Sequence, residues 1–139
     1  MDLNIHHTGV AVRDLAAAAE KYIAYFGYRK RTGIIHDPIQ EAYVQFLHLP
    51  GDSGYLEVVQ PDRPEAKLSQ VVAKGGGLHH ICYSVADIET ACNELSARGM
   101  YVIASPAPAV AFGNRRIAWL IGKNVCLTEL VERGEPDEL

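Results

Sequence analysis

The sequence of 139 residues predicts an α+β fold made of two βαβββ modules. The first observation is an internal repeat, in which IHHTGVAVRDL at positions 5–15 matches LHHICYSVADI at positions 78–88. A second match, at nearly the same offset, joins YLEVV at 55–59 to LTELV at 127–131. A pattern that recurs at a fixed offset over most of a chain indicates one supersecondary unit present twice.

Each module is expected to begin with a strand and a helix. The segment 5–12 has a strand-like pattern, and Asp14 is a natural N-cap for the helix that follows, which Gly27 ends. The second module copies these signals, because Asp87 precedes a helical run of apolar residues that stops at Gly99.

Three β-rich segments separated by turn residues follow each helix. They lie at 28–35, 42–49 and 54–60 in the first module and at 101–104, 115–121 and 125–131 in the second. The link 61–77 contains an apolar segment, 68–72, that predicts a short helix. The modules therefore cover about 4–62 and 77–132 of a single domain that spans 1–139.

The composition permits one well-buried core and excludes several classes of partner. Apolar residues make up 48% of the chain, and the net charge of −4 comes from interspersed acids and bases, so neither nucleic acid nor an anionic membrane is an expected partner. There is no apolar run of about 18 residues and no signal-peptide pattern, which predicts a cytoplasmic protein. The three cysteines form no CxxC pair and are expected to be reduced thiols.

The two His-His doublets are candidate functional residues within the repeat. Neighbouring side chains on a strand point to opposite faces, so only one histidine of each doublet can face a shared interior. His7 and His80 share their faces with small residues, which leaves room for a ligand, and we assign them to the cavity. We expect His6 and His79 to be structural or surface histidines on the helix side.

A glutamate closes each module and completes the pattern. Glu57 follows His7 at almost the same interval as that from His80 to Glu129, so a pseudo-twofold superposition carries one pair onto the other. A lone buried histidine or glutamate is more often structural, but four such residues under one symmetry favour a metal site. Mixed nitrogen and oxygen ligands predict a divalent ion of cobalt, nickel, zinc, manganese or iron rather than calcium.

At these residues the chain resembles the vicinal-oxygen-chelate superfamily, which includes glyoxalases, bleomycin-resistance proteins and dioxygenases. The segment GGGLHHICYSVADI at 75–88 is most similar to that of the methylmalonyl-CoA epimerases, and FGY at 26–28, FGN at 112–114 and TELVE at 128–132 agree with it. The resemblance implies that the two modules form a cleft or incomplete barrel, and that the family's metal ligands fall on the following residues. They are His7, Glu57, His80 and Glu129.

The implied activity is that of a metal-dependent isomerase or epimerase that moves a proton α to the carbonyl of an acyl thioester. The catalytic candidates are Glu129, Glu57 and Gln45, the last of which aligns with a base of the epimerases. Glutamine accepts no proton, so the two carboxylates are expected to carry it. The expected apolar wall of the cavity, with which Gln45 would share its face, consists of Tyr43, Leu47, Val59, Ile117 and Trp119.

Two other functions stay open at this point. A glyoxalase-like lyase acting on a hemithioacetal is the second choice, because Ala11 stands where bacterial glyoxalases place a glutathione-binding arginine. The third is a non-catalytic small-molecule binding or resistance protein. The resemblance also implies a small-molecule partner of the acyl-CoA type and a homodimer.

Overall fold

The computed structural model describes residues 1–139 and contains nine strands and three α-helices. In chain order the elements are β1 (Asn4–Ala11), α1 (Leu15–Phe26), β2 (Arg29–Lys30), β3 (Ile35–Asp37), β4 (Ala42–His48), β5 (Tyr55–Pro61), α2 (Leu68–Ala73), β6 (Gly77–Val85), α3 (Ile88–Ala97), β7 (Tyr101–Pro108), the 3-10 helix η1 (Val110–Phe112), β8 (Arg116–Ile121) and β9 (Thr128–Glu132). They fall into two compact units. The N-unit is His7–His79, and the C-unit combines Met1–His6 with His80–Leu139.

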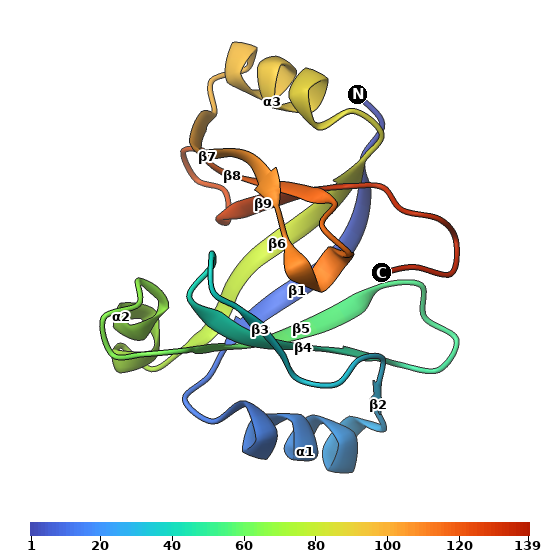
Figure 1. Cartoon of the computed structure of the whole chain (residues 1–139), viewed down its shortest axis with the longest axis vertical. Coiled ribbons are helices and arrows are strands. Elements are labelled where there is room, and N and C mark those ends of the chain that lie inside the picture. The colour runs from blue at the N-terminus through green and yellow to red at the C-terminus, as the bar shows by residue number, and fades with distance from the viewer. The chain divides into compact units, whose positions relative to one another are not determined.

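In the N-unit the strand order is β2-β4-β5-β1, and β3 also pairs with β4. Strands β1 and β5 are parallel, whereas the other pairs are antiparallel. Helix α1 covers one face of this sheet, where Leu15 and Ala19 join Val10, Leu47 and Val58 in a buried core (Figure 1). The opposite face of this sheet is not covered by α1.

The C-unit repeats this arrangement with the order β6-β9-β8-β7. Strands β6 and β9 are parallel, and β8 runs antiparallel to both β9 and β7. Helix α3 packs on one face through Ile88 and Ala91, against Leu120 and Leu130 (Figure 1). The prediction of an α+β fold with paired βαβββ modules is confirmed.

The helix boundaries follow the signals in the sequence. The Asp14 side chain accepts a hydrogen bond of 3.1 Å from the backbone N–H of Ala17, and Asp87 accepts one of 3.0 Å from Thr90. Gly27 ends α1 in a left-handed conformation, with φ of 80°. These caps satisfy backbone groups that a helix end leaves open.

Two strands differ most from their predicted bounds. The predicted strand 28–35 is divided into β2 and β3, because the chain bends around Thr32, whose hydroxyl accepts a hydrogen bond of 3.1 Å from the backbone N–H of Phe46. Strand β7 continues to Pro108, and its pairing with β8 shifts register after Val102 and again after Ala104. An edge strand tolerates prolines and bulges that a central strand does not.

The glycine run before β6 is a defined turn. Gly76 has a φ of +69°, and a Cβ placed there would lie 2.4 Å from the carbonyl oxygen of Ala11. Only glycine fits this close approach of backbone to backbone. The turn therefore fixes where the chain enters β6.

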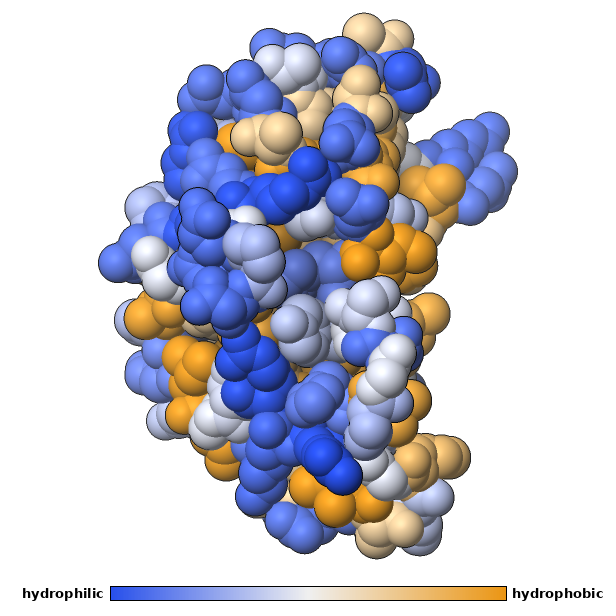
Figure 2. Space-filling model, turned by 90° about the vertical axis from the view of Figure 1, so that its right-hand side faces the viewer, coloured by the Kyte–Doolittle hydropathy of each residue, from blue (hydrophilic) through white to orange (hydrophobic).

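The surface is mixed in polarity. Figure 2 shows hydrophobic patches separated by hydrophilic side chains on the face in view. The large apolar residues that are most exposed include Tyr25, Phe26 and Tyr101. None of the helices has both the length and the apolar character needed to cross a membrane.

Candidate metal centre

The N-unit brings the first predicted His/Glu pair together. The register pairs Gly9 of β1 and Phe46 of β4 with Glu57 of β5, so the side chains of His7, Phe46 and Glu57 lie on the sheet face away from α1. His7 is 1% exposed and Glu57 is 5% exposed. His7 Nε2 lies 3.4 Å from Glu57 Oε1.

This spacing is compatible with two ligands of one metal ion. Two ligand atoms that each lie about 2.1 Å from a tetrahedrally coordinated ion are about 3.4 Å apart. An imidazole and a carboxylate supply the mixed nitrogen and oxygen donors that divalent transition ions accept. A buried carboxylate also needs a positive or hydrogen-bonding neighbour, because burial of an unpaired charge is costly. The donor set therefore fits a metal.

The C-unit places the second pair on an equivalent face. Glu129 of β9 is in register with Cys82 of β6 on one side and with Trp119 of β8 on the other. His80 lies two residues before Cys82 on the same face of β6. His80 is 1% exposed and Glu129 is 3% exposed. Each unit thus carries one buried histidine and one buried glutamate on the sheet face that its helix leaves uncovered.

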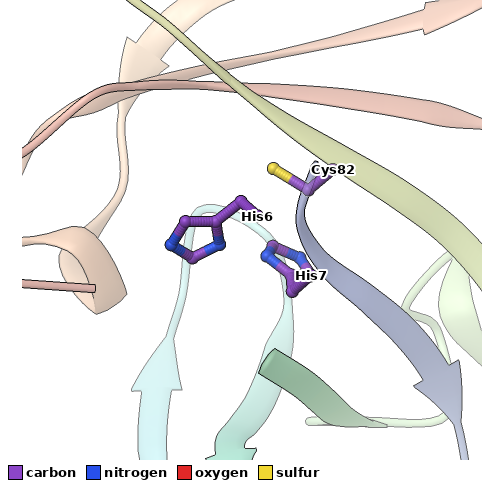
Figure 3. A group of neighbouring side chains, drawn as sticks. All are labelled: His6, His7 and Cys82. Atoms are coloured by element: carbon purple, nitrogen blue, oxygen red, sulfur yellow. The ribbon is translucent and has the colours of Figure 1, made fainter. Parts of the chain in front are cut away.

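The other histidine of the first doublet has different neighbours. His6 stands next to His7 on β1, and its ring contacts that of Phe112 in η1, with centroids 5.4 Å apart. The ligand atoms of His6 and Cys82 lie within 4.8 Å of one another in the C-unit. Figure 3 shows His6 and Cys82 with His7, the next residue along β1. His79 is half-buried at the start of β6.

The prediction that Gln45 faces the same cavity as His7 is wrong. Gln45 is in register with Val58, a member of the core under α1, and its Nε2 donates a hydrogen bond of 2.9 Å to the backbone oxygen of Thr32. Tyr43 and Leu47 share this face and pack in the same core, so their assignment to the cavity wall is also wrong. Strand alternation correctly grouped the three residues, but α1 covers their face.

The remaining residues of the expected apolar wall lie on the faces that carry the glutamates. Val59 follows Glu57 by two residues on β5, and Ile117 precedes Trp119 by two residues on β8. Sequence reasoning missed Phe46, whose ring lies against His7 with centroids 5.2 Å apart. The internal repeat could have identified Phe46, because the offset that relates His7 to His80 also relates Phe46 to Trp119.

Comparison with known families gives a match over most of the chain. A family model described as the glyoxalase/bleomycin resistance protein/dioxygenase superfamily matches residues 6–119. A curated relative, the ethylmalonyl-CoA/methylmalonyl-CoA epimerase of Cereibacter sphaeroides, is 33% identical over 131 residues, which are 91% of this chain and 95% of the relative.

Solved structures agree with these matches. The methylmalonyl-CoA epimerase of Mycobacterium tuberculosis is 25% identical and superposes with a TM-score of 0.83, covering 94% of this chain and 88% of that one. A variant of the Streptomyces coelicolor methylmalonyl-CoA epimerase in complex with 2-nitronate-propionyl-CoA is 28% identical, with a TM-score of 0.82 over 94% of this chain and 97% of that one. The chain belongs to the glyoxalase/bleomycin resistance protein/dioxygenase superfamily, within the family of the methylmalonyl-CoA epimerases.

Proposed function

We propose that the protein is a metal-dependent isomerase that moves a proton on the α-carbon of an acyl-CoA thioester. The observation that carries this proposal is the buried pair of His7 and Glu57, whose ligand atoms are 3.4 Å apart and which the second module repeats in sequence. A methylmalonyl-type acyl group is the proposed substrate, because that group is named for the relatives with the same modules.

The proposed metal ligands are two imidazoles and two carboxylates, one of each from either module. They are His7, Glu57, His80 and Glu129. These donors support a divalent ion of cobalt, nickel, zinc, manganese or iron. Such an ion, when bound, would stabilise the negative charge that develops on the thioester oxygen as the α-proton leaves.

The chain's own acids would move the proton. In the proposed reaction the carboxylate of Glu129 takes the α-proton, and the C–H electron pair moves into the enolate of the substrate. The carboxyl group of Glu57, in its protonated form, then delivers a proton to the opposite face of the carbon, which inverts its configuration. The apolar side chains of Val59 and Ile117, on the same faces as the glutamates, support exclusion of water from the carboxylates.

Exchange with deuterated solvent tests this proposal. Methylmalonyl-CoA incubated in D2O with the protein and Co²⁺ should gain deuterium at its α-carbon, as measured by mass spectrometry, and the gain should stop when a chelator removes the metal. The chelated protein is the control for spontaneous exchange.

The same assay separates the proposed isomerase from its alternatives. A glutathione hemithioacetal should react poorly, because Ala11, in register with Val59 on the Glu57 face, offers no cationic group to glutathione. Fast lyase turnover without thioester exchange would contradict the isomerase proposal and favour a glyoxalase-like lyase. Binding of both compounds without turnover would favour a non-catalytic binding protein.

We also propose that the protein works in the cytoplasm as a homodimer. Support for the location comes from three free cysteines, Cys82, Cys92 and Cys126, which suit a reducing compartment. Support for the dimer comes from exposed apolar side chains on strands at one edge of the C-unit, including Tyr101, Ile103 and Ile121. Light scattering on the purified protein tests the dimer.

A further inference from the structure

The two modules share an aromatic position that lies outside the matched segments. Phe46 in β4 and Trp119 in β8 are related by the same offset in sequence as the His-His doublets. Each is in register with the glutamate of its own module, Phe46 with Glu57 and Trp119 with Glu129. The repeat therefore includes an aromatic ring in addition to the histidine and the glutamate.

Both rings contact the histidine of their module in the same geometry. The Phe46 and His7 rings have centroids 5.2 Å apart and an interplanar angle of 80°. For Trp119 and His80 the corresponding values are 4.9 Å and 83°. These are edge-to-face contacts within the favourable range for aromatic pairs. The geometry is retained although one ring is a phenyl group and the other an indole.

A contact of this kind limits the rotation of an imidazole. The terminal torsion of histidine is broad and roughly two-fold, so strand geometry alone does not fix the plane of its ring. An aromatic ring packed against the imidazole restricts that torsion without using a ring nitrogen as a hydrogen-bond partner. A metal ligand benefits from such restriction, because the nitrogen lone pair must point at the ion.

We propose that Phe46 and Trp119 are positioning residues that hold the imidazoles of His7 and His80 in the orientation required to bind the metal. This inference rests on the proposed metal centre. Leu47 and Leu120, which follow Phe46 and Trp119 on the same strands, provide a contrast. They are also apolar, but they face the helices, in the cores under α1 and α3. The two faces of β4 and β8 thus have separate roles, one in ligand orientation and one in core packing.

The test measures binding of Co²⁺ alone, without substrate, to the full chain. The variants Phe46→Leu and Trp119→Leu should each weaken Co²⁺ binding about tenfold or more, as loss of a supporting neighbour of a metal ligand typically does. They should also change the visible absorption spectrum of the bound ion, which reports ligand geometry. Trp119→Phe keeps a ring against His80 and should retain most of the affinity.

Matched controls separate ligand orientation from stability. Leu47→Ala and Leu120→Ala, on the same strands but the opposite faces, should lower the melting temperature and leave the Co²⁺ affinity and spectrum unchanged. Leucine variants at 46 and 119 that bind Co²⁺ as the wild type does, with the same spectrum, would overturn the inference. Equal loss of affinity in the controls would overturn it too. A wild-type protein that binds no Co²⁺ at all would instead reject the proposed metal centre, and the inference with it.

Discussion

At the scale of single residues, the polar side chains of Glu57 and Gln45 lie on paired strands but have different surroundings. Glu57 is buried beside His7, whereas the Gln45 amide donates a hydrogen bond to the backbone of Thr32 and shares its face with the α1 core. Their strands are adjacent, but alternation along β4 and β5 turns the two side chains to opposite faces of the sheet. Residue type excluded Gln45 as a base, but it did not show that this side chain faces the α1 core and binds a backbone oxygen.

Glu129→Gln should abolish α-proton exchange of methylmalonyl-CoA. The amide keeps an oxygen that can bind an ion but accepts no proton, and a general base typically contributes about 10²- to 10⁴-fold to the rate. Mass spectrometry of the thioester in D2O measures the loss.

Gln45→Ala is the matched control for this prediction. It should leave the exchange rate near that of the wild type and cost about 1 kcal/mol in the free energy of unfolding, through loss of its hydrogen bond to Thr32. Normal exchange by Glu129→Gln, together with inactivity of a folded Gln45→Ala, would reverse the roles assigned to these two residues.

At the scale of elements, caps and turns decide where each helix and strand begins. The backbone N–H of Thr90 donates to the Asp87 carboxylate at the start of α3 and holds the pKa of that group below its ordinary value of 3.8. A glycine turn leads into β6, where Gly76 lies against the carbonyl of Ala11. These local contacts fix the ends of elements whose interiors are held by core packing.

Asp87→Asn should alter how the free energy of unfolding depends on pH in the acid range. Because the pKa of Asp87 is lower in the folded state than in the unfolded state, its contribution is present above the ordinary pKa of 3.8 and is lost as the pH falls through the lowered folded value. Urea unfolding at a series of pH values should therefore show a shallower loss of stability below about pH 4 in the variant than in the wild type. If the variant and the wild type lost the same free energy of unfolding below about pH 4, the Asp87 carboxylate would not be coupled to folding.

Gly76→Ala should destabilise the fold more than Gly77→Ala. Both glycines have positive φ, so each substitution carries the left-handed penalty of about 1–2 kcal/mol. Only at Gly76 would the added Cβ meet backbone, at 2.4 Å from the oxygen of Ala11, whereas at Gly77 it meets nothing within 4 Å. Urea midpoints of the two variants give the comparison, and equal losses would mean that the chain at Gly76 relaxes without cost.

At the scale of the whole molecule, the internal repeat allowed the fold to be predicted from the sequence. It also identified the candidate metal ligands. Two sequence matches at nearly equal offsets predicted both modules, and strand alternation selected His7 and His80 from their doublets. Alternation defines two faces but does not say which face a helix covers, and for that reason Gln45 was misplaced. The bend that divides β2 from β3 is held by the hydrogen bond from the backbone of Phe46 in β4 to the Thr32 hydroxyl, a contact that local sequence does not encode.

The stoichiometry of metal binding tests the proposal that His7, Glu57, His80 and Glu129 bind one metal ion together. Calorimetric titration of the metal-free protein with Co²⁺ should give one ion per chain, and His7→Ala and His80→Ala should each abolish that binding, because either change leaves three ligands and two uncompensated acids. Binding of two ions per chain, with one retained in each histidine variant, would mean that each module binds its own metal and would contradict the proposed four-ligand centre.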